Sequence, residues 1–443
     1  MPERNNKSLR PLVAGCLLFT FTTPARAQSP SERTAVVVEP KTTSATTPSN
    51  GVSPLPDPLT LSVARRFASS HRLEIVAARA QVRATSERPR IVSVLPDPVI
   101  FTSIDHVPFM FDGVDASIGV EQSFPLSHVL SNRRRAAEAS VGIARAESDR
   151  TKLDVELEAA DAFLMLLRQR QLIRILADQS ALAEQLRATT QARYASGTGT
   201  ASDLLRAETD VARLQGELQA AGHEEKAKQA MLNTSLGLNA ELPVPMLLTV
   251  SAQQPTQSWL EVSSRAAHDR PELAAARAQV ARSEADVSVM KSMYAPMAML
   301  RTGPAYTMAE GPGWMLMFGV SIPIWRSGLD AGVREANAMV AMGNAELGAM
   351  RRMVEGEVAD AFHSLESARA RLVTLREEVV PRATRAIEAT LADYAAGTAP
   401  LINVLDAEQA LWMVQLELVD AEFNFASRQV LLDRATARME SVE

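Results

Sequence analysis

The sequence predicts an α+β protein made of one unit that is used twice, and three observations support this fold class. A short segment, Tyr194-Ala195-Ser196-Gly197-Thr198, returns 200 residues later as Tyr394-Ala395-Ala396-Gly397-Thr398. Two stretches alternate strictly between apolar and polar or small residues, which indicates strands. Aromatic residues make up only 5% of the chain and alanine is abundant, which is typical of long packed helices.

The repeated segment predicts a helix–turn–helix tip in each half. Each copy interrupts a long apolar-periodic run with glycine and small residues, and the run restarts with Leu-x-Ala-Glu at 205–208 and at 405–408. Asp203 and Asn403 stand where a helix N-cap is expected. A period near 200 residues is too long for a solenoid repeat, so we predict two domain-sized repeats, 58–250 and 251–443.

The N-terminal segment 1–27 has the pattern of a secretory signal peptide. Basic residues precede an apolar run, and Ala25-Arg26-Ala27 ends the run with the small-x-small pattern of a cleavage site. Cys16 allows a second interpretation, because Val13-Ala14-Gly15-Cys16 resembles a lipobox whose cysteine would be lipidated. Both interpretations predict export. Residues 28–57 are rich in Ser, Thr and Pro and are expected to form a disordered linker.

After the linker, we expect a helix at 58–88 with a twin at 259–290, each followed by two strands. The stronger strand of each pair is predicted at 114–121 and at 314–322, where apolar residues occupy every second position. The weaker partner strands are predicted at 91–103 and 297–308. Pro125 and Pro323 stand at matching sites after the stronger strands, and proline ends a strand ladder.

Long helices are expected after each strand pair. No proline occurs from 132 to 193, and apolar residues recur there at intervals of three and four, which is typical of a coiled-coil seam. The seam positions are Leu153, Leu157, Ala160, Leu164 and Leu167, then Leu204, Ala207, Val211, Leu214 and Leu218, and in the second half Val358, Phe362, Leu365, Leu372, Leu375 and Val379. A helix of about sixty residues would span roughly 90 Å.

Several classes of function find no support in the sequence. The formal net charge of −6 gives no basic footprint, so nucleic acid is not an expected partner. The six histidines are scattered, and no P-loop, nucleophile elbow or dinucleotide fingerprint occurs. We therefore expect neither an enzyme nor a bound cofactor.

The strands raise a problem of closure. Four strands cannot form a barrel, because about eight are needed to surround a filled interior. Open strand edges cannot lie in lipid, since unpaired backbone groups there cost several kcal/mol each. The four strands therefore form either a small sheet in water or part of a barrel shared by several chains. The apolar faces, one of which carries Trp314 and Phe318, favour lipid, and three chains would supply twelve strands.

Together these features resemble the TolC family of outer-membrane efflux proteins over about 58–440. The resemblance rests on the duplication, the order of elements, the proline-ended strands, and the motifs Tyr-x-x-Gly-Thr and Leu-x-Ala-Glu. Leu95-Pro96-Asp97-Pro98 looks like the heavy-metal efflux (CzcC-like) branch. The family implies a homotrimer in outer-membrane lipid, with a shared 12-stranded transmembrane β-barrel and a long periplasmic α-helical, coiled-coil barrel.

The resemblance also implies a function and partners. The protein would be the passive exit duct of a tripartite efflux pump, with heavy-metal ions as the expected substrate. Its partners would be a periplasmic adaptor protein and an inner-membrane pump of the RND type, with the tip turns docking to the adaptor. These turns contain Gly197, Thr198, Gly397 and Thr398. A multidrug or type I secretion duct of the same architecture is an alternative, and a soluble periplasmic coiled-coil scaffold is a second alternative.

By the same resemblance, the tips would form a closable aperture at the periplasmic entrance. Tyr394 of the second tip would hydrogen-bond to Asp203 of the first. Asp406 matches a carboxylate of the family's entrance ring, whereas its companion position holds Asn403, so this ring would carry fewer charges. Arg206 occupies the position equivalent to Asp406 in the first tip.

Four methionines are candidates for a metal path through the strands. Met297 and Met299 are expected on one strand face, and Met315 and Met317 on one face of the next strand. Both faces would point to the lumen if the aromatic faces point to lipid. Thioethers are soft ligands that suit Cu(I). The alternative is that these methionines only fill irregular space.

Overall fold

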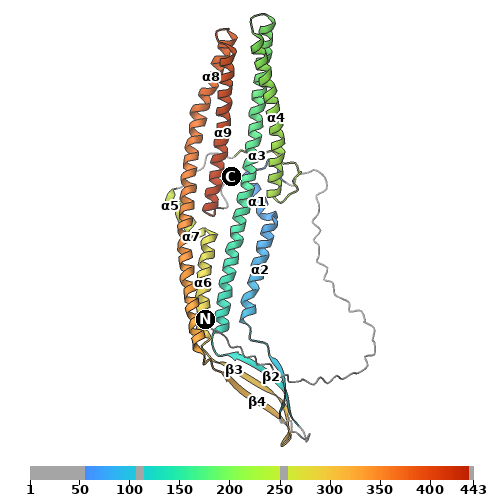
Figure 1. Ribbon diagram of the computed structural model, residues 1–443, viewed down its shortest axis with the longest axis vertical. Helices are drawn as coiled ribbons and strands as arrows, with labels where there is room; N and C mark the ends of the chain where they lie inside the picture. Colours follow the sequence, from blue (N-terminus) through green and yellow to red (C-terminus); the bar gives the residue numbers. More distant parts are fainter. Residues whose placement is uncertain (1–54, 106–113, 250–257, 439–443) are drawn as a thin grey trace, which may run out of the picture. The chain divides into compact units, whose positions relative to one another are not determined.

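The structure is a computed structural model that describes residues 55–105, 114–249 and 258–438. The predicted signal peptide 1–27 and nearly all of the predicted linker 28–57 lie outside these residues. The described part belongs to one unit of the chain and is mostly helical, with one small sheet (Figure 1). No helix in the described part is both long enough and apolar enough to cross a membrane.

Both halves contain the same order of elements. The first half comprises α1 (Leu61–His71), α2 (Leu73–Ser93), β1 (Val99–Asp105), β2 (Asp115–Pro125), α3 (Val129–Ala195) and α4 (Ala201–Ser235). The second half comprises α5 (Trp259–Asp269), α6 (Pro271–Ser292), β3 (Met297–Thr307), β4 (Gly311–Ser321), α7 (Arg326–Thr374), the π-helix η1 (Leu375–Val379), α8 (Val380–Ala395) and α9 (Leu401–Ala435). The element order of the predicted duplication is therefore present twice.

The prediction of one helix at 58–88 was wrong, because the structure has two helices there, α1 and α2. The predicted twin at 259–290 is likewise two helices, α5 and α6. The chain is extended at Arg72 (ψ 134°) and at Arg270 (ψ 123°), which separate α1 from α2 and α5 from α6. Pro271 begins α6 and disfavours helical backbone in the residue before it. Helix α2 also continues through Pro89 to Ser93, so β1 begins at Val99 and not at the predicted Ile91.

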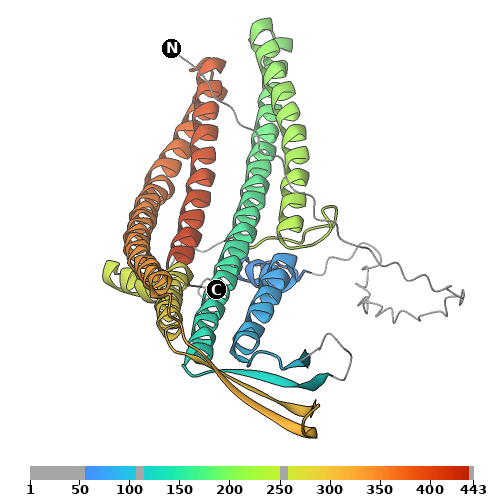
Figure 2. The same cartoon turned by 60° about the horizontal axis from the view of Figure 1, so that its bottom comes forward.

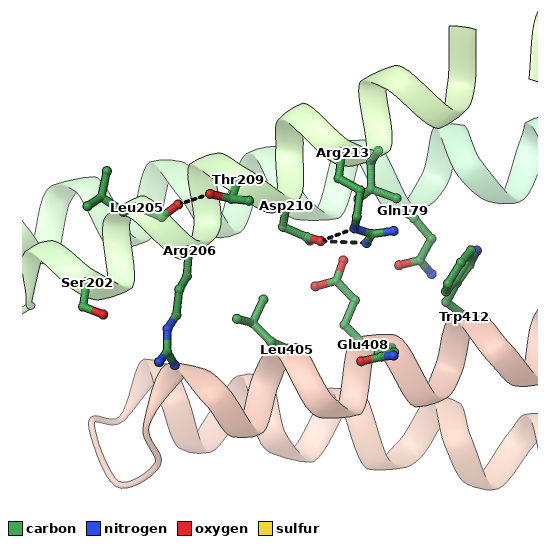
Figure 3. Close-up of a pocket in the computed structure, with 12 residues that line it drawn as sticks. Gln179, Ser202, Leu205, Arg206, Thr209, Asp210, Arg213, Leu405, Glu408 and Trp412 are labelled. Carbon is green, nitrogen blue, oxygen red and sulfur yellow. Dashed lines mark hydrogen bonds and ion pairs between the residues drawn. The ribbon is translucent and has the colours of Figure 1, made fainter. Parts of the chain in front are cut away.

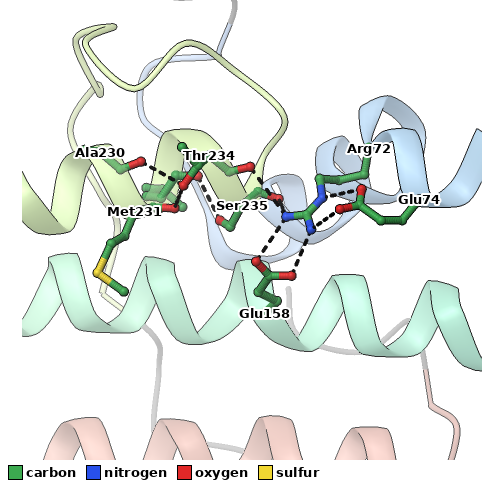
Figure 4. Close-up of polar contacts among 8 residues, drawn as sticks. Arg72, Glu74, Glu158, Ala230, Met231, Thr234 and Ser235 are labelled. Carbon is green, nitrogen blue, oxygen red and sulfur yellow. Dashed lines mark hydrogen bonds and ion pairs between the residues drawn. The ribbon is translucent and has the colours of Figure 1, made fainter.

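An arginine holds the break in the first half. Arg72 pairs with Glu74 at 2.8 Å and with Glu158 of α3 at 3.0 Å (Figure 4). It also donates a hydrogen bond of 3.0 Å to the carbonyl of Ser235, the last residue of α4. A cation is favourable at a helix C-terminus, where carbonyl groups lack helical partners. The break thus attaches the end of the returning helix to the long helix.

The second half repeats this arrangement with a buried arginine. Arg270 is only 1% exposed and pairs with Glu272 at 3.0 Å and with Glu357 of α7 at 2.6 Å. It donates a hydrogen bond of 3.2 Å to the carbonyl of Ala435, the last residue of α9. The duplication therefore extends to individual polar contacts.

The long helices differ between the halves. Helix α3 has 67 residues, which corresponds to roughly 100 Å, and packs on α4 through apolar side chains. The equivalent helix of the second half is interrupted by η1, where the N–H of Val380 reaches back five residues to the carbonyl of Leu375. Pro381 follows at once, and a proline both lacks an N–H group and collides with the carbonyl four residues before it. A π-turn widens the helix at this position.

The two halves lie side by side along α3. Helix α6 contacts α3 and α7 (Figures 1 and 2). Asn132 of α3 donates a hydrogen bond of 2.7 Å to Ser292 of α6. Helix α9 contacts α3 and α7 further along the unit. The predicted seam positions of the long helices are buried or partly buried. The α3–α4 and α8–α9 tips lie at the end of this unit that is opposite the sheet (Figure 1).

The sheet combines the strand pairs of both halves in the order β1-β2-β3-β4, with every neighbouring pair antiparallel. Strands β2 and β3 approach closely near Gly303, where an added Cβ would lie 2.1 Å from the carbonyl oxygen of Ile118. Only glycine fits this position. In the described residues, β1 and β4 each pair on one side only, so both edges of the sheet are open.

Candidate functional site

The two tips have the same turn geometry. Gly197 (φ 73°) and Gly397 (φ 76°) are in the left-handed region, which glycine adopts without a steric penalty. The N–H of Thr198 bonds to the carbonyl of Arg193, and the N–H of Thr398 to that of Asp393, both at 2.9 Å. The glycines and threonines of both turns are exposed.

The helix caps after the turns differ from the prediction. Thr200 is the N-cap of α4, because its side chain accepts a hydrogen bond of 3.1 Å from the N–H of Asp203. Asp203 itself lies in the first turn, where its charge favours the positive end of the helix. Pro400 precedes α9, so Asn403 is also inside its helix and is not the cap.

Tyr394 joins the second tip to the first hairpin. The side chain is only 6% exposed, whereas its twin Tyr194 is 48% exposed. The Tyr394 hydroxyl lies 3.3 Å from Thr190 Oγ1 of α3. The guanidinium of Arg193 lies 4.6 Å from the centroid of the Tyr394 ring and donates a hydrogen bond of 3.1 Å to the Tyr394 carbonyl. Cation–π contacts of this kind stabilise by about 0.5–2 kcal/mol.

The expected hydrogen bond between Tyr394 and Asp203 is not present among the described residues, because Thr190 occupies the position of the phenol's partner. Thr190 and Arg193 were missed in the sequence. They precede the tip turn on α3. Thr190 recurs as Thr390 in the second repeat and Arg193 is replaced by Asp393, and neither position by itself indicates a contact with Tyr394. Only the packing of α8 against α3 brings them to Tyr394.

The remaining aperture candidates, Asn403 and Asp406, are exposed on the first turns of α9. Arg206, the equivalent of Asp406 in the first tip, lines a pocket between α4 and α9 together with Glu408. The structure therefore places all the predicted tip residues within one region. It separates exposed Asp406 from buried Glu408, two residues later.

The strand register brings the four candidate methionines to one face of the sheet. Met299 lies opposite Gly319, and Arg301 lies opposite Met317, so the β3 and β4 positions share a face. Arg301 lies on the same face, where its Nε donates to Glu121 of β2 at 2.9 Å. This side of the sheet is therefore a face of thioethers and one ion pair, hereafter the methionine face.

The opposite face of the sheet is apolar and exposed. Trp314 and Phe318 of β4 are 72% and 75% exposed, and the Trp314 indole donates a hydrogen bond of 2.7 Å to Thr302. The other large exposed apolar or aromatic side chains of this face are Ile100, Ile104, Ile118, Val120, Phe124, Tyr306, Leu316 and Val320. An apolar patch this extensive indicates contact with lipid or with another protein.

The side chains that usually bind metal ions do not gather in the described residues. Within 55–105, 114–249 and 258–438, no three or more His, Cys, Asp or Glu side chains group as metal ligands. The methionines fall outside that definition, since their ligand atom is a thioether sulfur. The arrangement is suited to lining a path and to holding two hairpins together.

Comparison with known proteins identifies a family and several similar proteins. Residues 111–238 and 262–438 match the outer membrane efflux protein family. The cobalt-zinc-cadmium resistance protein CzcC of Cupriavidus metallidurans is 23% identical over 387 residues, which cover 86% of this chain and 90% of that protein. The pyoverdine export outer membrane protein OpmQ of Pseudomonas putida is 25% identical over 334 residues, which cover 72% of this chain and 70% of OpmQ.

The fold has a close match among solved structures. The outer-membrane channel OprN aligns with a TM-score of 0.72 and 20% identity, over 85% of this chain and 89% of that chain. The family match alone spans more than half of the sequence. The predicted resemblance is thereby confirmed, and the chain belongs to the TolC-type outer membrane efflux protein family.

Proposed function

We propose that this protein is the exit duct of a tripartite efflux pump, and that three copies close one transmembrane barrel. The observation that carries the proposal is the sheet, which has two open edges and one exposed apolar face. Unpaired strand edges are not tolerated in lipid, whereas β1 of one copy could pair with β4 of the next. Three copies would then supply twelve strands, with the apolar face in lipid and the methionine face in the lumen.

The same proposal assigns the parts of the chain. Residues 1–27 would direct export, 28–57 would form the linker, and 58–250 and 251–443 would form the two repeats. The exposed turns at Gly197-Thr198 and Gly397-Thr398 would dock to a periplasmic adaptor, which would join the duct to an inner-membrane pump of the RND type. Because a passive duct needs no catalytic group, the pump would supply the energy.

Heavy-metal ions are the substrate class that we favour. The support is the alignment over 86% of this chain with CzcC, a cobalt-zinc-cadmium resistance protein. The pyoverdine export protein OpmQ aligns at similar identity, so export of organic molecules is the second candidate. Deletion of the gene from its host tests both. We expect the minimum inhibitory concentrations of these metal ions to fall at least fourfold and to recover on complementation. Loss of tolerance to organic compounds alone would favour the second candidate.

The methionine face gives the metal hypothesis a sharper test. Leucine has nearly the volume of methionine but no sulfur. We expect replacement of Met297, Met299, Met315 and Met317 by leucine to sensitise cells to copper and silver ions only. A matched control replaces Met339, Met342 and Met353, exposed methionines of α7, by leucine. Unchanged tolerance at normal protein level would leave packing as the role of the methionine face.

We further propose that the tips form the aperture of the duct, with Tyr394 as its latch and Asp203, Asn403 and Asp406 near the axis. The contacts of Tyr394 with Thr190 and Arg193 support a hairpin held closed by weak bonds, since a hydroxyl pair contributes about 0.5–1.5 kcal/mol. Three symmetric copies would act together.

Single-channel recording in planar bilayers tests the aperture. The pair Tyr394→Phe and Asp203→Ala, or Thr190→Val alone, should raise conductance, whereas Tyr194→Phe at the exposed twin should not. Asp406→Asn should weaken cation selectivity, because a ring of carboxylates favours cations. Parental conductance in the Tyr394 and Thr190 variants would show that these contacts do not hold the aperture.

A further inference from the structure

A pocket of about 840 Å³ lies between α4 and α9, with α3 as its floor (Figure 3). It is formed within one chain and lies beside the proposed aperture residues Asp203, Asn403 and Asp406, none of which lines it. Pockets of this volume accommodate drug-sized ligands. The lining residues used below are Gln179, Asp210, Arg213, Leu405, Glu408 and Trp412.

The central feature of the pocket is a buried carboxylate without a partner. Glu408 is only 5% exposed, and neither of its carboxylate oxygens has a hydrogen-bond partner. Its side chain points from α9 across the pocket toward Asp210 of α4 (Figure 3). A buried charge of this kind is costly unless a donor pairs with it.

The charged groups that face Glu408 come from α4. Asp210 raises the cost of a second negative charge, and Arg213 lowers it. Arg213 is nevertheless committed elsewhere, since its N–H groups donate to Asp210 at 2.7 Å and to Glu217 at 2.8 Å. Helix α3 contributes the neutral Gln179, which donates to Gln415 at 3.2 Å. Burial, reinforced by Asp210, raises the pKa of the Glu408 carboxyl to about 7.

The walls of the pocket complement this carboxylate. The indole Nε1 of Trp412 is buried and has no hydrogen-bond partner, so an unpaired donor lies on the same helix as the unpaired acceptor. Leu405 and Leu214 add aliphatic surface. Two cations, exposed Arg206 and paired Arg213, also line the pocket. The unpaired Glu408 carboxylate, the Trp412 ring and the apolar walls together match a molecule with a cationic end and an apolar body.

We propose that this pocket binds an amphipathic organic cation whose ammonium group pairs with Glu408 and whose apolar body lies against Trp412 and Leu405. A transition-metal ion fits less well, because the described lining offers only the two carboxylates of Asp210 and Glu408 and no histidine or cysteine. An anion would be repelled by the negative charge of the same carboxylates. The proposal needs neither the trimer nor the pump, so it can fail while the duct function stands.

The linked proton gives the proposal a signature that packing alone would not produce. A proton and an ammonium group compete for the same carboxylate, so binding requires ionised Glu408. Affinity should therefore fall between pH 8 and pH 6, where the ammonium group of the ligand stays charged. A variant without the carboxylate should lose this pH dependence.

The test is a fluorescence titration of the purified full-length protein in detergent with dansylcadaverine, an aromatic primary amine whose emission reports a less polar environment. Dansylamide, which lacks the ammonium tail, measures uptake by micelles. We expect saturable binding at pH 8 that weakens at least tenfold in Glu408→Gln and severalfold in Trp412→Phe. Glu208→Gln, at the exposed carboxylate that is equivalent to Glu408 in the first repeat, is the matched control and should bind like the parent.

Glutamine has the shape of glutamate, so Glu408→Gln removes the charge and leaves the packing volume nearly unchanged. Gel filtration and circular dichroism check that the variants fold. The parent itself supplies an independent comparison through its affinities at pH 8 and pH 6. Three results would overturn the proposal: no saturable binding to the parent, equal affinity for dansylamide, or equal affinity in the parent and in Glu408→Gln.

Discussion

Three charged side chains, Arg65, Glu156 and Asp433, meet in the buried space between α1, α3 and α9. Arg65 lies 3.7 Å from Glu156 and 3.6 Å from Asp433, and these distances are long for charge-assisted hydrogen bonds. One oxygen of each carboxylate has no hydrogen-bond partner. Burial raises the pKa of both carboxyl groups, and that of Asp433 reaches about 6. The helices are thus joined by an ion cluster that is incompletely paired at neutral pH.

The pH dependence of stability follows from Asp433. Its pKa is about 6 in the folded chain and near 3.8 when unfolded, so the folded state binds the proton more tightly. The stabilisation is complete below about pH 4 and is lost as pH rises through 6, with an upper limit on the order of 3 kcal/mol. We expect the melting temperature to rise from pH 7.5 to pH 5, and this rise to be smaller in Asp433→Asn. Asp406→Asn should keep the parental rise. An unchanged rise in Asp433→Asn would exclude this carboxyl as its source.

At the scale of the elements, the repeated arginine breaks differ in burial. Arg270 and its partner Glu272 have buried side chains, although its second partner Glu357 is about half exposed. The Arg72 side chain is 12% exposed, and both of its partners, Glu74 and Glu158, are about half exposed. Removing one member of a buried pair costs up to about 3–5 kcal/mol, whereas exposed pairs contribute about 1 kcal/mol or less. The cost for Arg270 lies below that upper limit, because Glu272 also pairs with Arg434 at 3.1 Å. The same motif is therefore expected to matter much more in the second half.

A pair of variants tests this difference. Arg270→Met should lower the melting temperature by several degrees more than Arg72→Met, because methionine fills similar space without the charge. Thermal denaturation of both proteins in the same detergent is the measurement. Equal decreases for the two variants would mean that burial does not separate the two breaks.

The sequence predicts elements well where a pattern is local. The tips, the strand pairs and the long helices follow from glycine turns, period-two alternation and the spacing of Leu153 and its successors. The break at Arg72 could not be predicted, since neither glycine nor proline adjoins it and the apolar periodicity continues across it. Pro381 was a visible signal, but the choice between a kink and a π-turn depends on packing around Leu375.

The candidate site was predictable only in part, because its contacts join residues that are far apart in the sequence. Tyr394 and Asp203 are placed in the tips by the repeat itself. The partner of Tyr394 is Thr190, which depends on how α8 packs against α3. Glu408 likewise shares a motif with Glu208, yet Glu408 is buried and lines the pocket, whereas Glu208 is exposed and does not line it. Tertiary packing therefore gives equivalent positions of the two repeats different burial and different contacts.

At the scale of the whole molecule, the open edges of the sheet are the decisive feature. Strand β1 lacks a neighbour on one side and β4 lacks one on the other, within the residues described, and β1 and β4 run antiparallel. Pairing between copies would satisfy the backbone hydrogen bonds of both edges, so that every strand of the proposed barrel would have a neighbour on each side. A ring closes only if each copy pairs with two others, and this distinguishes the trimer from a dimer or an open chain.

Disulfide cross-linking between these edges tests the trimeric duct most directly. The only cysteine of the sequence is Cys16, so each introduced pair has no more than this one native cysteine to compete with. Thr102→Cys on β1 is combined in turn with Leu316→Cys, Phe318→Cys or Val320→Cys on the same face of β4. We predict that at least one pair gives a covalent trimer on oxidation in outer-membrane preparations, whereas each single variant gives none. Only monomers from every pair, or products that continue beyond three chains, would contradict a closed trimeric barrel.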